Sequence, residues 1–281
     1  MTLNFKTFVE AEKRRLWDAD DHRKRSVAKA AKFNSFKGIG QMDISDIGVR
    51  DVHQFFDHLN ATGRSDTTII RYGAMLTKVF RAAKRLKDIP EVPEFTTPRA
   101  AAEVRPLYFT KKQVLDMCDY FDDSHPEWWM RHWIIIGCKT GMRHGEILTI
   151  TPETITSGIS VSGNTHHEVY LAKTKALTDR RVAISTTARA ALAALGDCPR
   201  KAQYDAHRFY RAWEEMRVDL LDGDDRYVFH TTRHTFATDM ANDLKAPIST
   251  IGNAMGHRSL KTTARYIKTK SEHQHALVEQ L

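Results

Sequence analysis

A proline-rich stretch divides this sequence into two parts that are expected to fold separately. Four of the eight prolines lie between residues 88 and 106, and this stretch has little hydrophobic periodicity. Proline lacks an amide donor and interrupts helices and central strands, so such a stretch is typical of an interdomain linker. The sequence therefore predicts a first domain at residues 1–90, a linker at 91–106, and a second domain with a C-terminal tail at 107–281.

The first 90 residues have the pattern of a small helical domain. Apolar residues recur at helical spacing, and no alternating strand pattern interrupts them. Ser65 and Asp66 are good N-cap residues for the last of these helices. The predicted helices cover residues 4–18, 22–32 and 49–59, and a fourth begins after Ser65-Asp66.

Most of the positive charge of the chain lies in this first domain. The whole chain has a net charge of +8, and residues 1–90 alone hold 18 Lys and Arg against 11 Asp and Glu. A basic segment suits a polyphosphate backbone, although a merely solvated basic face would have the same composition. The candidate contacts are the basic residues of the second predicted helix: Arg23, Lys24, Arg25, Lys29 and Lys32.

The second domain combines helices with a short region of strand periodicity. Residues 159–161, 168–171 and 181–184 predict a small antiparallel sheet, and helices are expected at 187–195, 203–221, 231–244, 248–255 and 260–267. Trp128, Trp129 and Trp133 precede an isoleucine run, a pattern that favours a buried core helix over a base-stacking surface. The predicted class is mainly α (α+β), with a helical domain followed by a mostly helical domain that contains a small sheet.

The composition also excludes several classes of protein. The sequence contains no run of about eighteen apolar residues, so no membrane span is expected. The N-terminus lacks the apolar core of a signal peptide. Cys118, Cys138 and Cys198 have no metal-ligand spacing and suggest no disulfide framework. A reducing cytoplasm is the simplest expectation.

Six residues along the second domain have the chemistry needed to attack a phosphodiester. In chain order they are Arg143, Lys173, His230, Arg233, His257 and Tyr266. Together they supply cations, proton carriers and one oxygen nucleophile, for a reaction whose transition state concentrates negative charge on non-bridging oxygens. Each alone is more often a surface charge, a helix end or a packing residue, so the prediction rests on their joint occurrence.

In this order and with these separations, the six residues closely resemble those of the tyrosine recombinase (phage integrase) family of lambda-integrase-like site-specific recombinases. The resemblance implies that Tyr266 is the nucleophile and that Arg143 and Arg233 bind the scissile phosphate. It implies a hydrogen bond from His257 to that phosphate, and a general-acid role for Lys173 in the turn between the last two strands.

The resemblance extends to three further positions and to the first domain. His230 occupies the position proposed for the general base, Glu146 matches a supporting acidic position, and His234 is expected behind the residues that contact the phosphate. Residues 1–90 resemble a SAM-like core-binding domain, which would bind double-stranded DNA at specific core sites. No metal or other cofactor is implied.

The implied function is site-specific recombination, as in DNA integration by a phage or mobile element. The reaction is expected to pass through a 3′-phosphotyrosyl intermediate and a Holliday junction. A homotetramer on two DNA sites is expected to carry it out, in the cytoplasm of a bacterial host and near its nucleoid. An accessory directionality factor is possible. The alternatives are a multimer-resolving recombinase of the same family, a type IB topoisomerase, and a DNA-binding regulator that does not cleave.

Overall fold

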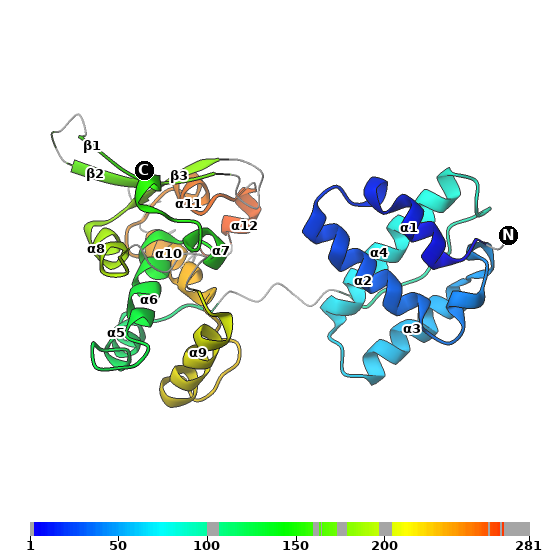
Figure 1. Cartoon of the computed structure of the whole chain (residues 1–281), viewed down its shortest axis with the longest axis horizontal. Coiled ribbons are helices and arrows are strands. Elements are labelled where there is room, and N and C mark those ends of the chain that lie inside the picture. The colour runs from blue at the N-terminus through cyan, green and yellow to red at the C-terminus, as the bar shows by residue number, and fades with distance from the viewer. Residues whose placement is uncertain are drawn as a thin grey trace, which may run out of the picture. The chain divides into compact units, whose positions relative to one another are not determined.

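The computed structural model describes residues 3–99, 107–159, 163, 165–172, 179–196, 204–257, 259–264 and 266. The chain divides into two compact units, Met1–Glu103 and Val104–Leu281 (Figure 1). The first consists of helices, and the second combines helices with a three-stranded sheet. The mainly α (α+β) class predicted from the sequence is confirmed.

Four helices pack around an aromatic core in the first unit. They are α1 (Phe5–Leu16), α2 (Asp20–Asn34), α3 (Val49–Ala61) and α4 (Asp66–Arg85), with 3-10 turns at Ile39–Gln41 and Ile44–Asp46. The ring of Phe33 lies edge-on to Phe5 at 4.9 Å and to Phe55 at 5.1 Å between ring centroids. All three rings are fully buried, and each contributes roughly 1.5–3 kcal/mol by leaving water.

The segment after α4 packs against the first unit further along the chain than its prolines suggest. The ring of Phe95 lies edge-on to Phe56 at 5.8 Å, and the Thr96 N–H donates to His53 Nε2 at 3.2 Å. A Cβ at Gly73 on α4 would collide with the side chain of Thr97. Although the sequence predicts a linker from residue 91, residues 95–97 therefore belong to the surface of the helical unit.

In the second unit, a small sheet lies beside the helical core (Figure 1). Strands β1 (Ile155–Ile159), β2 (Thr165–Leu171) and β3 (Arg180–Ile184) are antiparallel in the order β1-β2-β3. Ile155 and Val182 both pair with Val169, which is fully buried. The first strand begins at Ile155 rather than Ile159, because the exposed polar residues of β1 obscure its alternation in the sequence.

The helices of this unit are α5 (Lys111–Tyr120), α6 (Trp129–Thr140), α7 (His144–Ile147), α8 (Thr186–Ala194), α9 (Ala206–Leu220), α10 (Thr231–Asn242), α11 (Ile248–Met255) and α12 (Leu260–Ala264). A 3-10 turn at Pro152–Thr154 precedes β1. Helix α12 is described over Leu260–Ala264 of the predicted 260–267; residue 266 is in a turn, and residues 265 and 267 lie outside the described part of the chain.

Helix α6 forms the centre of the second unit and packs directly against α10. Trp133 is fully buried, as its position in the apolar run predicts, whereas Trp128 is 39% exposed and precedes the helix. Gly137 allows the close approach of α10, because a Cβ there would lie 2.8 Å from Thr232 Cβ. This contact brings the C-terminal end of α6 close to the first turn of α10.

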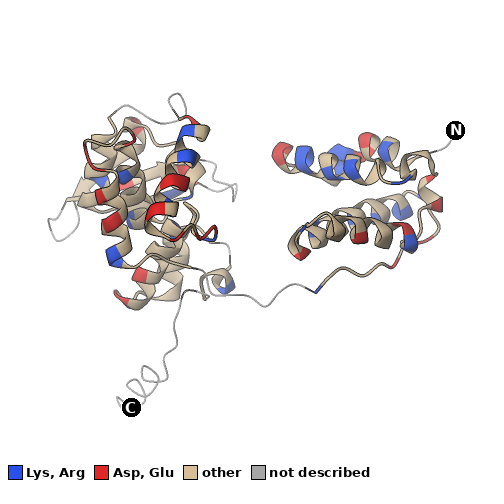
Figure 2. Cartoon of the chain, turned by 90° about the horizontal axis from the view of Figure 1, so that it is seen from below, with Lys and Arg blue, Asp and Glu red and all other residues tan. Residues whose placement is uncertain are grey.

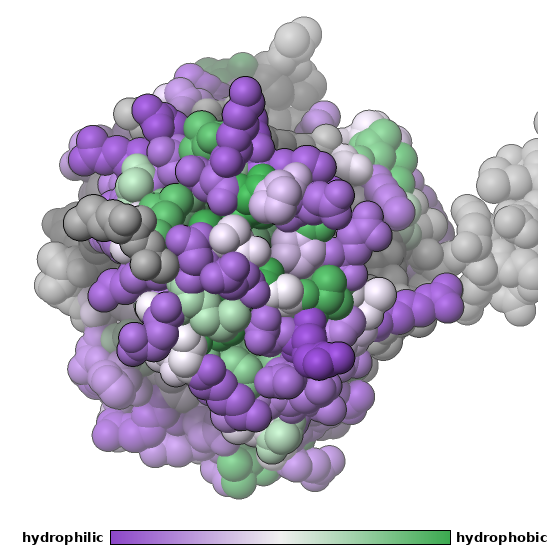
Figure 3. Space-filling view, turned by 90° about the vertical axis from the view of Figure 1, so that its right-hand side faces the viewer, coloured by the Kyte–Doolittle hydropathy of each residue, from purple (hydrophilic) through white to green (hydrophobic). Residues whose placement is uncertain are grey.

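Hydrophilic residues cover most of the face seen in Figure 3, and its apolar residues appear in small separate groups. Among the helices in the described residues, none has the length and apolar character needed to cross a bilayer.

Candidate active site

The first candidate arginine follows the C-terminal end of α6. Gly141 ends this helix in the left-handed conformation, with a φ of 61°, and Arg143 then precedes α7. The backbone N–H of Arg143 donates to Glu146 Oε2 at 2.7 Å, and its guanidinium donates to Glu146 Oε1 at 2.7 Å. Glu146 therefore fixes both the backbone and the side chain of Arg143.

The second candidate arginine, Arg233 on α10, is almost completely buried. Its guanidinium donates to the backbone carbonyls of Gly141 and Met255 and lies 4.0 Å from Glu146 Oε2. Burial, together with the charge of Arg143, lowers the pKa of Arg233 to about 10, whereas Glu146 and Tyr266 act in the opposite direction. Arg233 is still charged at neutral pH, so this buried guanidinium suits the binding of an anion.

Glu146 also binds a third arginine, which the sequence analysis did not single out. Arg180, the first residue of β3, places Nη2 2.8 Å from Glu146 Oε2 and donates through Nη1 to the carbonyl of Ala254. Burial opposes ionisation of Glu146, but the Arg143 N–H and the charges of Arg180 and Arg143 outweigh it and lower its pKa. Glu146 is therefore an ionised carboxylate among three guanidiniums.

The candidate nucleophile lies in contact with a histidine of α10. Tyr266 Oη is 2.7 Å from His234 Nδ1, and the tyrosine is 6% exposed. Its ring packs in an apolar cluster with Ile251 and Met255 of α11, and with Ala237 of α10. A phenol needs a proton acceptor to become a nucleophile at neutral pH, and an imidazole nitrogen at hydrogen-bond distance can serve as one.

Two further histidines surround this pair. The ring of His257 is stacked on Tyr266, with 6.3 Å between centroids and 14° between planes, and its Nδ1 lies 2.9 Å from Thr263 Oγ1. The ring of His230 is nearly perpendicular to His234 at 4.8 Å. The structure thus brings His230, His234, His257 and Tyr266 together around the C-terminal end of α11.

Five of the six residues proposed for chemistry lie in this region, and the sixth, Lys173, lies outside the described residues. His234, expected behind the residues that contact the phosphate, lies with its Nδ1 2.7 Å from the Tyr266 hydroxyl. The signal that could have revealed Arg180 is a charged residue at the first position of a strand that is half-buried, seven positions after Lys173 in the sequence.

A sequence model described as the phage integrase family matches residues 108–273 of this chain. This match spans more than half of the chain and contains all the residues of the site described above. The chain belongs to the phage integrase family. It is therefore a recombinase enzyme of the tyrosine type. A comparison with curated proteins found no match.

Solved structures of DNA-bound recombinases share the fold of this family member. The Tn1549 transposon integrase in complex with a circular intermediate DNA has a TM-score of 0.76 at 14% identity, covering 100% of both chains. A lambda integrase dimer bound to a COC′ core site has a TM-score of 0.70 at 14% identity, covering 95% of this chain and 78% of the lambda integrase chain. The XerH site-specific recombinase bound to difH, in a pre-cleavage complex, has a TM-score of 0.64 at 18% identity, covering 90% of this chain and 76% of the XerH chain.

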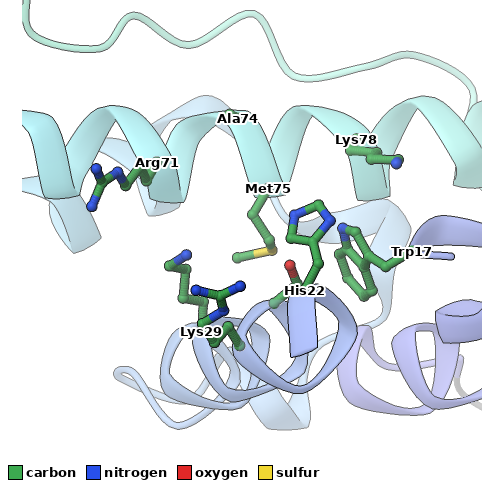
Figure 4. Close-up of a pocket in the computed structure, with 9 residues that line it drawn as sticks. Trp17, His22, Lys29, Arg71, Ala74, Met75 and Lys78 are labelled. Atoms are coloured by element: carbon green, nitrogen blue, oxygen red, sulfur yellow. The ribbon is translucent and has the colours of Figure 1, made fainter. Parts of the chain in front are cut away.

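A basic groove lies between α2 and α4 in the helical unit of this integrase-family chain (Figure 4). It has a volume of about 550 Å³, and its cationic lining comes from Arg25 and Lys29 on α2 and from Arg71 and Lys78 on α4. Other Lys and Arg residues are spread along the helices of this unit (Figure 2). The groove places four cations around one hollow, which suits a polyanion.

The five basic residues predicted as contacts on α2 do not all line this groove. Arg25 and Lys29 do, whereas Arg23 donates to the backbone carbonyl of Asp18 and pairs with Asp20. Lys24 and Lys32 are not among the lining residues. Arg71 and Lys78, which the sequence analysis did not single out, lie seven residues apart and therefore on one face of α4.

Proposed function

We propose that this protein is a site-specific recombinase that cleaves and rejoins double-stranded DNA through a covalent bond to Tyr266. The observation that carries the proposal is the contact between the Tyr266 hydroxyl and His234, beside the buried and charged Arg233. A nucleophile, a proton acceptor and a phosphate-binding cation are thereby available in one place. Membership of the phage integrase family supports this assignment.

The proposed reaction begins with transfer of the Tyr266 proton to His234 Nδ1. We assign this role to His234 in place of His230 because its ring nitrogen lies 2.7 Å from the tyrosine hydroxyl, and His230 packs against the imidazole that receives the proton. The phenolate oxygen then forms a bond to phosphorus, and the bond from phosphorus to the 5′-oxygen breaks. The products are a 3′-phosphotyrosyl link and a free 5′-hydroxyl, which receives its proton from Lys173. Attack by a 5′-hydroxyl of the partner strand reverses these steps, so the phosphotyrosyl bond conserves the energy needed for rejoining.

In this mechanism, Arg143, Arg233 and His257 stabilise the negative charge that develops on the non-bridging oxygens. Planar guanidiniums donate paired hydrogen bonds to phosphate, which a lysine ammonium does not reproduce. Glu146 holds Arg143 in place and remains ionised, because three arginines surround it. Its charge also reduces the repulsion between these arginines when no DNA is bound.

The helical unit would bind the DNA backbone at the groove between α2 and α4, where four cations can replace condensed counterions. For the complete reaction we propose four protomers on two sites and a Holliday junction between the two strand exchanges. Integration of a phage or mobile element within a bacterial cell is the preferred role, and resolution of DNA multimers is the alternative within the family.

The test is covalent trapping on the DNA that flanks the gene. Duplexes from this region, each nicked at a different position, release a short fragment after cleavage and leave the protein attached. We expect the unmodified protein to form an adduct stable to denaturant on a subset of these duplexes, and Tyr266→Phe to bind the same duplexes without forming it.

The other outcomes would identify the rival functions. Binding without any adduct by the unmodified protein would indicate a DNA-binding regulator. Relaxation of supercoiled plasmid by the monomer, without preference for any sequence, would indicate a type IB topoisomerase.

A further inference from the structure

Arg180 connects two segments of the active site that are distant in the sequence. Its Nη2 lies 2.8 Å from Glu146 Oε2, 34 residues away, and its Nη1 donates to the carbonyl of Ala254, 74 residues away. Its side chain is 11% exposed and that of Glu146 is 8% exposed, so water screens this ion pair weakly. One guanidinium therefore joins α7 to the C-terminal end of α11.

Arg180 also packs against the Gly-His pair that carries His257. Gly256 has a φ of 62°, and a Cβ at this residue would lie 2.9 Å from both Cδ and Nε of Arg180. The glycine thus meets two requirements, a left-handed conformation and room for the guanidinium. The position of the Arg180 side chain and the path of the backbone into His257 therefore depend on each other.

The charge of Arg180 affects the neighbouring arginine as well. Glu146 Oε2 accepts from Arg180 at 2.8 Å, whereas Arg233 Nη1 lies 4.0 Å from the same oxygen. Without Arg180, this buried carboxylate oxygen would lose a cationic partner and attract Arg233 more strongly. Such a shift would move Arg233 toward Glu146 and away from a bound phosphate.

We propose that Arg180 is a positioning residue that holds Glu146 and the α11 end so that Arg233 and His257 can bind the scissile phosphate. This inference rests on the proposed function, because it concerns the same site. Arg180 is also the first residue of β3, so its two hydrogen-bonded contacts anchor the start of that strand.

The test compares Arg180→Met with Arg181→Met, its matched control. Arg181 is the next residue of β3, but its side chain is 61% exposed and lies 3.4 Å from Glu168. Both variants would be assayed on a nicked duplex that the unmodified protein cleaves, for equilibrium binding and for the single-turnover rate of adduct formation at saturating DNA. We expect Arg180→Met to lose roughly tenfold to a hundredfold in rate with nearly unchanged affinity, because a small misplacement of catalytic groups costs that much.

A double substitution separates positioning from a general loss of structure. If Arg180 restrains the charge of Glu146, then Glu146→Gln in the Arg180→Met background should recover part of the lost rate. Simple addition of the two losses would overturn the proposal, as would equal rates for Arg180→Met and Arg181→Met. Absence of any adduct with the unmodified protein would instead contradict the proposed function.

If Arg180→Met does not fold, Arg180→Lys replaces it in the comparison. A lysine can reach Glu146 or the Ala254 carbonyl but cannot donate to both as a planar fork does. We expect this variant to cleave more slowly than the unmodified protein while binding DNA equally well. An unchanged rate would overturn the proposal.

Discussion

Replacement of Gly137 by alanine would test whether α6 and α10 pack as closely as the structure shows at the helix contact beneath the active site. The added Cβ would lie 2.8 Å from Thr232 Cβ and closer still to its hydroxyl. That hydroxyl donates to the Phe229 carbonyl at 2.7 Å in a buried position, so rotating Thr232 aside would break a buried hydrogen bond. Overpacking of this kind costs about 1–3 kcal/mol, against a gain of up to about 1 kcal/mol in helix propensity.

The matched control is Gly145→Ala in α7, where a Cβ would meet no atom within 4 Å. This variant should keep the propensity gain without the collision, so the free energies of unfolding of the two variants should differ by about 2 kcal/mol. Four of the five tryptophans lie in the second unit, so tryptophan fluorescence mainly follows its unfolding in urea. With an m-value of about 2 kcal/mol/M, the midpoints should lie about 1 M apart. Coinciding midpoints would refute the reasoning.

Three further predictions concern other groups. Arg143→Lys and Arg233→Lys should each slow adduct formation by at least about a hundredfold although the charge is kept, and a near-normal single-turnover rate would mean that catalysis does not need the planar guanidinium of that arginine. Arg25→Gln and Lys29→Gln should each reduce the slope of log affinity against log salt by about one, measured in binding titrations of the full chain. An unchanged slope would place the DNA elsewhere. Burial lowers the pKa of His144 from 6.5 to about 4. Between these pH values the histidine is protonated in the unfolded chain but neutral in the folded one, so the free energy of unfolding falls as the pH drops from about 6.5 to 4. His144→Phe should lose less stability over this interval in urea unfolding, and an equal loss would mean that other groups cause it.

The sequence predicted much of the fold because the relevant signals are local. The helices of the first unit follow from apolar spacing and N-cap residues, and the strand pairs of the second unit follow from β-branched runs. The start of β1 at Ile155 was harder to predict, because this strand is largely exposed and lacks a clear alternation. Phe95 also shows that a proline-rich stretch can pack on a domain, since its ring fills space beside Phe56.

The site itself was only partly predictable, because its decisive contacts are long-range. The order of Arg143, Arg233, His257 and Tyr266 gave the residue types needed for the chemistry. The contact between His234 and Tyr266 joins residues 32 positions apart, and the two bonds of Arg180 span 34 and 74 positions. No periodicity in the sequence reports such pairs.

The most direct test of the account is to identify the residue and the DNA end that form the covalent bond. The adduct trapped on a nicked duplex would be digested with protease and nuclease, and the modified peptide sequenced by mass spectrometry. The account predicts a nucleotide joined through its 3′-phosphate to the hydroxyl of Tyr266. Attachment to any other residue, or through a 5′-phosphate, would contradict it.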